Sequence, residues 1–404
     1  MSPLRVLALN CGGATFKYKV LDMPAEGVRC AGLLDRLATE GASLTHWNSA
    51  RQRAEHPCPG ADYQQAIALA LSKAKESCAD KWPPDAIAHK LAHAGVHYRA
   101  PCLISEAVKE AMRAVTELVP LHNPPSLRAI EICERLLPEV PQVGVFETGF
   151  HVTIPPEAYV YGIPYEWCER HGARKFGFHS CSHRYVAERM AALLAKPLEQ
   201  VSLISCHLGS GTSVCAVREG QSADISSGLT PQSGTIMSTR PGDFDPAVIT
   251  YVMGREGLSW EQVMEALVRR GGLLGISGVS GDARDLERAA AEGNERARLA
   301  LEVFVYQVRR YIGQFLLLLP ELDALVFTGG IGEKSRTLRR QICLGLDRFG
   351  MVLDPERNQA LQGEGCISSP ASPVGIWVVP TDEEVVVSRE AFRLLRKEAA
   401  TPCR

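Results

Sequence analysis

The sequence has no apolar stretch long enough to span a bilayer. Its longest strongly apolar run, residues 315–319, follows Gln314 and is ended by Pro320 and Glu321. It also lacks the charge of a polyanion-binding protein, because 44 Lys and Arg residues face 46 Asp and Glu residues and leave a formal net charge of -2. We therefore expect no membrane association and no nucleic-acid partner.

The cysteines show no pairing pattern, and the amino terminus shows no targeting segment. There are 13 Cys, an odd number, and no two of them form a CxxC pair, so buried free thiols in a reducing cytoplasm fit better than disulfides or zinc sites. The opening MSPLRVLALN enters an apolar strand pattern within four residues, without a separate apolar segment and cleavage site. We expect a cytoplasmic protein that is mature from its first residue.

Two similar hairpins indicate a duplicated fold. Residues 4–10 and 16–23 predict strands joined by small residues at 11–15, and the same layout recurs at 201–221 around a turn at 209–212. At 404 residues the chain is long enough for two domains. A third apolar strand, beginning at residue 323, is followed by a glycine turn and a helix, which is an arrangement that aims backbone N–H groups at phosphate or ribose.

Apolar residues at helical spacing predict helices between the strands, so the fold class is mixed α/β. The predicted helices cover residues 111–118, 182–194, 286–299 and 303–319. Three glycine turns, each directly after an apolar strand, favour phosphate binding, since glycine lets an anion approach with no Cβ in the way. Lys17 follows the first turn and is either a phosphate ligand or a solvated strand residue.

The histidines gather in the middle of the chain and none follows His207. The segments HNPPS, FETGFH and FGFHSCSH each set a His beside aromatics or prolines, where a structural role is the simpler interpretation. His179 and His183 are four residues apart, as zinc ligands on a helix are, but no Glu follows in the metalloprotease arrangement. We therefore disfavour a zinc site.

Three charged turns complete the pattern. MSTRPGDFDP contains Arg240, GVSGDARD contains Asp282 and Arg284, and PTDEE begins a helix with acidic residues. The first two are also compatible with self-paired surface turns, and the third with either helix capping or Mg²⁺ binding. Together the turns and charges fit phosphoryl transfer, although the sequence contains neither a Walker loop nor a kinase HRD element.

The residues resemble the acetate kinase family from Val6 to about Leu394. The motifs that carry the resemblance are LALNCGGATFKY, VPLHNPPSL, VFETGFHVTIPPEAYVYGIPYEW, RKFGFHSCSHRYV, TRPGDFDP, GGLLGISGVSGDARD, VFTGGIGEKS and VPTDEE. The resemblance implies the duplicated, ribonuclease H-like fold of actin, sugar kinases and heat-shock ATPases, with two domains that close on a nucleotide cleft. Residues 1–148, completed by a helix at 385–404, would form one domain and residues 149–384 the other, in a homodimer.

The resemblance further implies a reversible, in-line transfer of the γ-phosphoryl group of ATP to acetate, giving acetyl phosphate and ADP, with Mg²⁺ or Mn²⁺. It assigns catalytic roles to His179, Arg240, Glu147, Lys90 and His122. It places Lys90, Ala92, Leu121, Phe178, Pro231 and Arg240 around the acyl substrate. It assigns the nucleotide to Asn10, Lys17, His207, Gly209, Ser210, Gly211, Asp282, Ala283, Arg284, Gly330, Ile331, Gly332 and Lys334, and the metal to Asn10 and Glu383.

Several positions depart from the family pattern. Lys90 stands in HKLAHAG where the family has an Arg. The planar guanidinium, which can donate two parallel hydrogen bonds, is thereby replaced by a compact ammonium. Glu147 replaces an Asp, which keeps the carboxylate on a longer arm, and Ser210 replaces an Asn of the second turn. Lys334 also replaces an Asn, and Gly13 and Ala14 stand where the family has serines.

Ala92 falls where the family commonly has a Val in the acyl pocket. The lost methyl groups leave room that would favour propionate or butyrate over acetate, at about 0.8 kcal/mol per CH₂. The departures at Lys90, Glu147 and Ser210 are also compatible with a nucleotide-binding module of weakened catalysis. Lys334 is compatible with a different phosphoryl donor, such as pyrophosphate.

Overall fold

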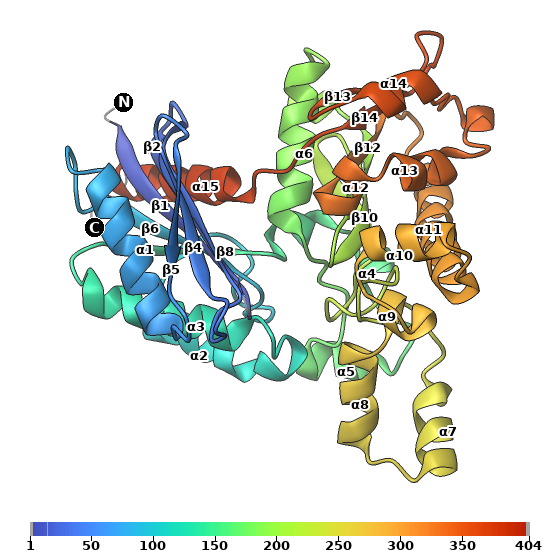
Figure 1. Cartoon of the computed structure of the whole chain (residues 1–404), viewed down its shortest axis with the longest axis horizontal. Coiled ribbons are helices and arrows are strands. Elements are labelled where there is room, and N and C mark those ends of the chain that lie inside the picture. Colours follow the sequence, from blue (N-terminus) through green and yellow to red (C-terminus); the bar gives the residue numbers. More distant parts are fainter. Residues whose placement is uncertain (1–2, 14, 401–404) are drawn as a thin grey trace. The chain divides into compact units, whose positions relative to one another are not determined.

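The computed structural model describes residues 3–13 and 15–400 and divides into two compact units (Figure 1). Unit 1 comprises Met1–Gly149 and Asp382–Arg404, and unit 2 comprises Phe150–Thr381. Ala14, a predicted departure from the family pattern, lies outside the described residues. Each unit contains its own sheet and its own apolar core.

Unit 1 is built on one sheet with the strand order β5-β4-β3-β2-β1-β6-β8-β7. Its strands are β1 (Leu4–Cys11), β2 (Phe16–Met23), β3 (Gly27–Asp35), β4 (Ser43–Asn48), β5 (Arg53–Pro57), β6 (Ala86–Leu91), β7 (Cys102–Leu103) and β8 (Gln142–Phe146). Its helices are α1 (Tyr63–Ser77), α2 (Glu106–Ala114), the 3-10 turn η1 (Thr116–Leu118), α3 (Asn123–Leu136) and α15 (Glu383–Ala400).

Successive side chains along β1 and β6 point to opposite faces of the sheet, and this decides which of them reach the core of unit 1. Leu7, Leu9 and, on β6, Ile87 pack into one apolar cluster with α1 and α3. Since successive strand residues point to opposite faces, Asn10 and Lys90 face the other side of the sheet. These two residues are partners in the parallel register of β1 and β6, and α15 contacts both strands.

Unit 2 is built on a sheet with the order β11-β10-β9-β12-β14-β13. Its strands are β9 (Leu203–Leu208), β10 (Thr212–Arg218), β11 (Gln221–Ile225), β12 (Ala324–Thr328), β13 (Gly365–Cys366) and β14 (Gly375–Val378). Its helices are η2 (Gly149–Thr153), α4 (Pro156–Tyr159), α5 (Tyr165–His171), α6 (Ser180–Leu193), η3 (Leu198–Gln200), α7 (Ala247–Glu256), α8 (Trp260–Arg269), α9 (Gly272–Ser277), α10 (Ala283–Ala291), α11 (Glu295–Leu316), α12 (Gly329–Lys334), α13 (Arg336–Cys343), η4 (Asp347–Phe349) and α14 (Pro355–Ala360).

The two faces of the unit 2 sheet carry separate apolar clusters. Ile204 of β9 and Phe327 of β12 pack with α11, whereas Leu203 and Val326 of the same strands pack with α6. Helices therefore cover both faces of the sheet, as Figure 1 shows for α6 and α11. Strands buried on both sides explain why β9 and β12 read as almost continuous apolar runs.

The two sheets repeat one strand pattern, and this confirms the predicted duplicated α/β fold. In unit 1, β3, β2 and β1 pair antiparallel, and β1, β6 and β8 continue in parallel. In unit 2, β11, β10 and β9 pair antiparallel, and β9, β12 and β14 continue in parallel. Both predicted hairpins are present, as β1–β2 and β9–β10.

Two predicted helices are wrong in their bounds. The segment 286–299 is divided between α10 and α11, because Gly293 adopts φ +94° and the Asn294 side chain accepts a hydrogen bond from the N–H of Ala297 and starts a new helix. The segment 111–118 is also divided. There α2 starts earlier, at Glu106 behind the capping residue Ser105, and ends at Ala114.

The described cysteines are unpaired, as the sequence predicts. All twelve cysteines in the described ranges are free, which confirms for them the prediction of unpaired thiols. Burial raises the pKa of the Cys11 and Cys206 thiols well above the usual value, as expected for side chains that fill the core. Within residues 3–13 and 15–400, no helix is long and apolar enough to cross a membrane.

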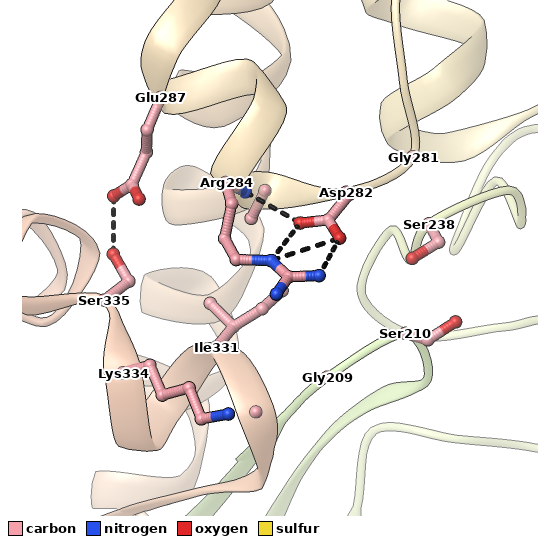
Figure 2. A pocket seen from close by; sticks show the side chains of 12 residues that line it. Gly209, Ser210, Ser238, Gly281, Asp282, Arg284, Glu287, Ile331, Lys334 and Ser335 are labelled. Carbon is pink, nitrogen blue, oxygen red and sulfur yellow. Dashed lines mark hydrogen bonds and ion pairs between the residues drawn. The ribbon is translucent and has the colours of Figure 1, made fainter.

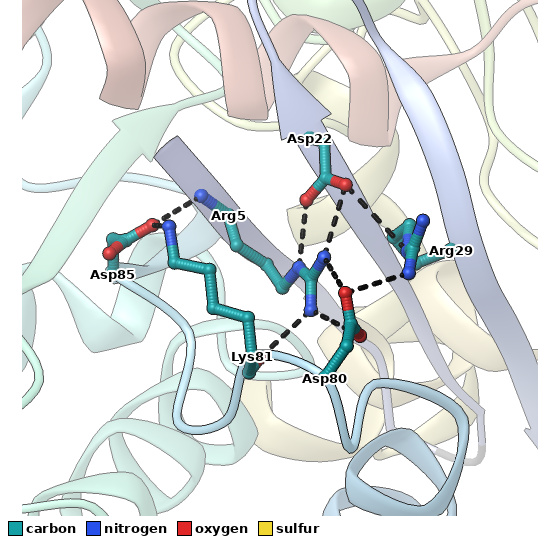
Figure 3. Close-up of polar contacts among 6 residues, drawn as sticks. All are labelled: Arg5, Asp22, Arg29, Asp80, Lys81 and Asp85. Carbon is teal, nitrogen blue, oxygen red and sulfur yellow. Dashed lines mark hydrogen bonds and ion pairs between the residues drawn. The ribbon is translucent and has the colours of Figure 1, made fainter. Parts of the chain in front are cut away.

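A buried guanidinium joins three segments of unit 1 (Figure 3). Arg5 on β1 is 3% exposed, and its N–H groups donate to Asp22, to Asp80 and to the carbonyl of Lys81. Every donor of the guanidinium therefore has an acceptor. The Arg5 hydrogen bond also lowers the pKa of Asp80 to about 2, so the stabilisation is complete above about pH 4 and is lost as the pH falls through about 2.

We predict that Arg5→Met lowers the free energy of unfolding of unit 1 by about 2 kcal/mol at pH 7, because charged hydrogen bonds are lost from a buried position. Arg29→Met removes a neighbouring guanidinium that is 35% exposed and also pairs with Asp80, and should cost less than about 1 kcal/mol. Urea titrations followed by circular dichroism at pH 7 and pH 2 measure both. Equal losses for the two variants at pH 7 would contradict the assignment.

Candidate active site

A pocket of about 580 Å³ lies in unit 2 where two glycine turns meet (Figure 2). One turn follows β9 and the other forms the start of α12, directly after β12. A Cβ built on Gly209 would lie 3.9 Å from the backbone nitrogen of Gly330, so the two turns are in contact distance. The pocket is lined by Gly209, Ser210, Ser238, Gly281, Asp282, Ala283, Arg284, Glu287, Gly330, Ile331, Lys334 and Ser335.

Most of the residues predicted to bind the nucleotide therefore share one pocket. Three of the residues predicted from unit 2 are not among those that line it. His207 lies on β9, before the turn, Gly211 ends the turn, and Gly332 is buried inside α12. The Asn10 and Lys17 side chains belong to unit 1.

The start of α10 is fixed by a local ion pair. The Asp282 carboxylate accepts the backbone N–H of Arg284 at 2.9 Å and also the Arg284 side chain, from Nε at 3.0 Å. The hydrogen bond from the Arg284 side chain lowers the pKa of Asp282. Because the Arg284 side chain is 80% exposed, the pair orients the pocket rim more than it stabilises the fold.

A buried arginine holds α12 in place. Arg339 on α13 is 1% exposed, and its Nη1 donates to the carbonyl oxygens of Gly332 at 2.9 Å and Glu333 at 2.8 Å. Its Nε donates to Asn358 at 2.8 Å. These bonds satisfy carbonyls at the end of a helix of only six residues. The Gly330 end of α12, which lines the pocket, thereby gains a rigid support.

Four lining residues were not predicted from the sequence. Ser335 donates to Glu287 at 2.6 Å and caps α13, so the two side chains close one wall of the pocket. Glu287 lies four residues after Ala283 on α10, and this helical spacing could have identified it. Ser238 and Gly281 lie side by side. A Cβ built on Gly281 would be only 2.9 Å from the carbonyl oxygen of Ser238, so the two backbones approach closely. No local sequence signal indicates that approach.

His179 and Arg240 meet at Gly211. A Cβ built on Gly211 would lie 2.9 Å from His179 Nε2 and 3.2 Å from Arg240 Nη2, so only glycine fits between them. His179 adopts φ +60° immediately before α6, a conformation that is uncommon for residues other than glycine. The hairpin turn that lines the pocket thus also separates the two side chains expected to act on the phosphoryl group.

Buried serines and histidines fix the His179 ring. Its Nδ1 lies 2.8 Å from Ser213 Oγ, which also lies 2.8 Å from His183 Nε2. Burial lowers the pKa of His183 well below the usual value, so this ring is neutral near pH 7. His207 stacks on His179 at 4.4 Å between ring centroids and bonds to Ser182 through Nδ1 at 2.7 Å. His183 is therefore a support for His179 through Ser213.

Arg240 is held as a partly buried cation. Its Nη1 donates to the Pro231 carbonyl at 2.7 Å, which brings a residue of the predicted acyl pocket beside it. Burial lowers the pKa of Arg240 to about 10, so the guanidinium stays charged at pH 7. Phe178, another predicted pocket residue, is 4% exposed and accepts a bond from His151 Nε2 at its carbonyl. A partly buried guanidinium can bind the two oxygens of a short carboxylate.

In unit 1, carboxylates converge on Lys90. Its Nζ lies 2.6 Å from Glu383 Oε2 and 3.4 Å from Glu147 Oε2. Asn10 Nδ2 lies 3.4 Å from the same Glu383 oxygen and 3.2 Å from Glu384 Oε1. The structure therefore brings together the predicted metal residues Asn10 and Glu383 with the two departures Lys90 and Glu147.

The other predicted residues of unit 1 lie on β2, just after β6 and just before α3. Lys17 is exposed on β2 opposite Asn10, and Ala92 is buried just after β6. Leu121 is 42% exposed. Its carbonyl oxygen lies near the first glycine turn, 3.8 Å from a Cβ built on Gly13. His122 directly precedes α3.

The acidic start of α15 combines helix capping with a place in the charged cluster. Asp382 accepts the backbone N–H of Val385 at 3.3 Å and pairs with Lys19 at 2.6 Å, which is a capping role. Glu383, the next residue, instead extends to Lys90. One position therefore caps the helix while its neighbour belongs to the charged cluster.

Known proteins resemble this chain over nearly its whole length. The sequence profile of the Acetokinase family matches residues 5–389. The acetate kinase of Carboxydothermus hydrogenoformans is 42% identical over 97% of this chain and 99% of its own length.

Solved structures agree with the sequence matches. The acetate kinase of Porphyromonas gingivalis is 37% identical over 97% of this chain and all of its own, with a TM-score of 0.87. A propionate kinase from Francisella tularensis is 34% identical over 96% of this chain and 98% of its own, with a TM-score of 0.89. With matching sequence, matching fold and a glycine turn set between His179 and Arg240, the chain belongs to the acetokinase family.

Proposed function

We propose that this protein transfers the γ-phosphoryl group of ATP to acetate, or to another short carboxylate, and forms an acyl phosphate and ADP. The observation that carries the proposal is the shared turn at residues 209–211. Gly209 and Ser210 line the pocket, and Gly211 lies against His179 and Arg240. A nucleotide whose adenosine occupies the pocket would therefore extend its phosphates along the turn to a cation and an imidazole.

The residues of unit 2 suit an in-line transfer. A carboxylate oxygen attacks the γ-phosphorus, the bond from that phosphorus to the bridging oxygen breaks, and ADP leaves with the electron pair. No proton has to move, so catalysis requires positioning and neutralisation of charge more than a base. The Arg240 fork would bind carboxylate and phosphoryl oxygens, and His179 Nε2 would stabilise the equatorial oxygens.

The cluster in unit 1 would hold the metal that accompanies the nucleotide. Of the two residues predicted to bind it, Glu383 offers a carboxylate and Asn10 an amide oxygen, and both are donor types that Mg²⁺ or Mn²⁺ prefers. Among the described residues no group of three or more His, Cys, Asp or Glu side chains could hold a metal ion. Mg²⁺ commonly takes its other ligands from phosphates and water, and its bound charge neutralises the transferred group.

Of the function classes left open by the sequence, the enzyme is favoured over a nucleotide-binding module. Family membership carries this choice. Lys90 and Glu147, which replace an Arg and an Asp of the family, also keep the charges of those residues. Both form ion pairs in one cluster with Glu383. A module that used ATP only for conformational change would have no need of that cluster.

We predict that purified protein with Mg-ATP and acetate forms a hydroxamate-trappable acyl phosphate, and that Arg240→Ala lowers kcat at least about 100-fold. The reason is the loss of a preorganised cation from the transition state. The matched control is Arg189→Ala, whose guanidinium pairs with Glu364 at the surface of the same unit and should leave the rate unchanged. Absence of acyl phosphate with every acid in a folded, ATP-binding protein would refute the proposed activity.

Acyl preference offers a second test. Ala92 follows β6 and is 8% exposed, and a valine there would reduce the space available to a longer acyl chain. We predict that wild-type protein has a higher kcat/KM for propionate than for acetate, and that Ala92→Val lowers this ratio about tenfold. Initial rates with acetate, propionate and butyrate measure it. A wild-type preference for acetate that the substitution does not alter would exclude Ala92 as the determinant.

We also propose a homodimer formed through unit 2. Helices α5 and α7 have no buried residue, and α8 has only Val263, yet they expose large apolar side chains. Tyr251 is 64% exposed, Trp260 52% and Trp167 47%. Apolar surface of this extent typically marks an interface, and a second copy of the chain is the partner that the family resemblance implies.

Charge placed on this surface should separate the subunits. We predict that the double variant Tyr251→Glu with Trp260→Glu elutes as a 44.0 kDa monomer in light-scattering chromatography, whereas wild-type protein has twice that mass. Leu136→Glu, at a position 45% exposed in unit 1, is the control and should remain dimeric. A wild-type monomer, or dissociation by the control as well, would count against this surface.

We place the enzyme in the cytoplasm. Its twelve described cysteines are unpaired, which suits a reducing compartment. ATP, the proposed phosphoryl donor, is also available there.

A further inference from the structure

The segment that carries Arg240 forms a closed loop in unit 2. The N–H of Gly234 donates to Asp243 Oδ1 at 2.7 Å, and the N–H of Asp243 donates to the Gly234 carbonyl at 2.8 Å. Inside the loop, the N–H of Met237 donates to the Arg240 carbonyl at 3.0 Å and holds residues 237–240 together. Asp243 therefore closes the base of the loop, three residues after Arg240.

The Asp243 carboxylate also fastens this loop to α11. Its Oδ2 accepts a hydrogen bond from Arg310 Nη2 at 2.8 Å and another from the Tyr311 hydroxyl. Tyr311 is 8% exposed, and burial raises the pKa of its hydroxyl, so this group stays protonated and donates near pH 7. Gln307, one helical turn before Tyr311, accepts the N–H of Ile236 at 2.6 Å. The base of the loop is thus attached to a helix of 22 residues.

The closed base also sets the surroundings of the Arg240 guanidinium. Its Nη1 donates to the Pro231 carbonyl at 2.7 Å, and the N–H of Gly242 donates to the Gln232 carbonyl at 3.1 Å. The chain segments before and after the loop are therefore joined beside the carbonyl that Arg240 contacts. A side chain that binds a reacting group has to be held to within about 0.5 Å, so the closure of the loop bears directly on Arg240.

The ion pair of Asp243 with Arg310 contributes little to the stability of the fold. The side chains of the two residues are 38% and 45% exposed, respectively, and ion pairs at such positions are weak because water screens them. The local effect is larger, since one carboxylate joins a loop backbone, a guanidinium and a buried hydroxyl. The main consequence of Asp243 is therefore the position of the loop.

We propose that Asp243 is a positioning residue for Arg240. It holds the loop so that the guanidinium faces the turn at residues 209–211, where Arg240 Nη2 would lie 3.2 Å from a Cβ built on Gly211. Asp243 acts only through Arg240 and does not itself touch the carboxylate or the phosphoryl group. The inference rests on the proposed function, because it takes the role of Arg240 from that reaction.

The test begins with Asp243→Asn, which keeps the shape of the side chain but places an amide where Arg310 and Tyr311 donate. We expect kcat/KM for acetate to fall at least about tenfold, since a small misplacement of a reacting group is costly. The matched control is Asp245→Asn, in the same segment, whose carboxylate accepts the N–H of Ala247 at 2.9 Å. The control should change kcat/KM less than about threefold.

A double-mutant cycle separates the positioning of Arg240 from a general disturbance of unit 2. If Asp243 acts through Arg240, its substitution has nothing left to misplace once that guanidinium is gone. In protein that carries Arg240→Ala, Asp243→Asn should therefore lower kcat/KM further by less than about threefold.

Amide hydrogen exchange adds a measurement that needs no turnover. Peptides covering residues 231–243 should exchange at least about threefold faster in Asp243→Asn than in Asp245→Asn, because the base of the loop is loosened. Peptides from β9 should exchange equally in the two variants.

Three results would overturn the inference. The first is a folded Asp243→Asn protein that loses less than about tenfold in kcat/KM, or no more than the Asp245→Asn control. The second is a further loss of about threefold or more in the Arg240→Ala background, which would mean that Asp243 acts elsewhere. The third is equal exchange of residues 231–243 in the two variants.

Tyr311→Phe keeps the inference testable if Asp243→Asn does not fold. It removes a donor to Asp243 and leaves the ring packing in place, and it should lower kcat/KM at least about threefold in wild-type protein but not in the Arg240→Ala background. An unaltered rate in this variant would then count against the inference. Wild-type protein that forms no acyl phosphate would refute the proposed function, whereas normal turnover by folded Asp243→Asn protein would refute this inference alone.

Discussion

Both units depend on one constraint, the pairing of a central strand that is antiparallel to one neighbour and parallel to the other. In unit 1 that strand is β1 and in unit 2 it is β9. Because parallel strands end at the same edge of a sheet, the hairpin turn after the central strand lies beside the loop after its parallel neighbour. The Gly209 and Gly330 turns meet in this way in unit 2, as do Asn10 and Lys90 in unit 1.

The two units treat buried charge differently. In unit 2, Arg240 donates to the carbonyl of Pro231, which carries no formal charge, and the buried histidine behind His179 is neutral. The charge of the guanidinium is thereby left for an anion. In unit 1 the carboxylate of Glu383 is already matched by Lys90. The two units therefore differ in that one buries part of a cation beside a neutral carbonyl and the other buries an ion pair.

Local patterns predicted the hairpins well, because a small-residue turn between apolar strands is specified by adjacent residues. The break at Gly293 was missed, since the apolar spacing continues across it. The Ser213 bridge between His179 and His183 could not be predicted either, because Ser213 and His183 are 30 positions apart and meet only when α6 packs against β9, the strand paired with β10. For the site residues, motifs indicated which side chains to consider, whereas the Lys90 ion pairs depended on where α15 returns to the first sheet.

The burial of the thiols gives each unit a built-in reporter of its own opening. Cys11 ends β1, and Cys206 lies in the middle of β9. Both thiols are buried and held protonated, so an alkylating reagent reaches each one only after its strand separates from the surrounding core. The alkylation rates of the two cysteines therefore report the local unfolding of the two halves of one chain independently, without any added label.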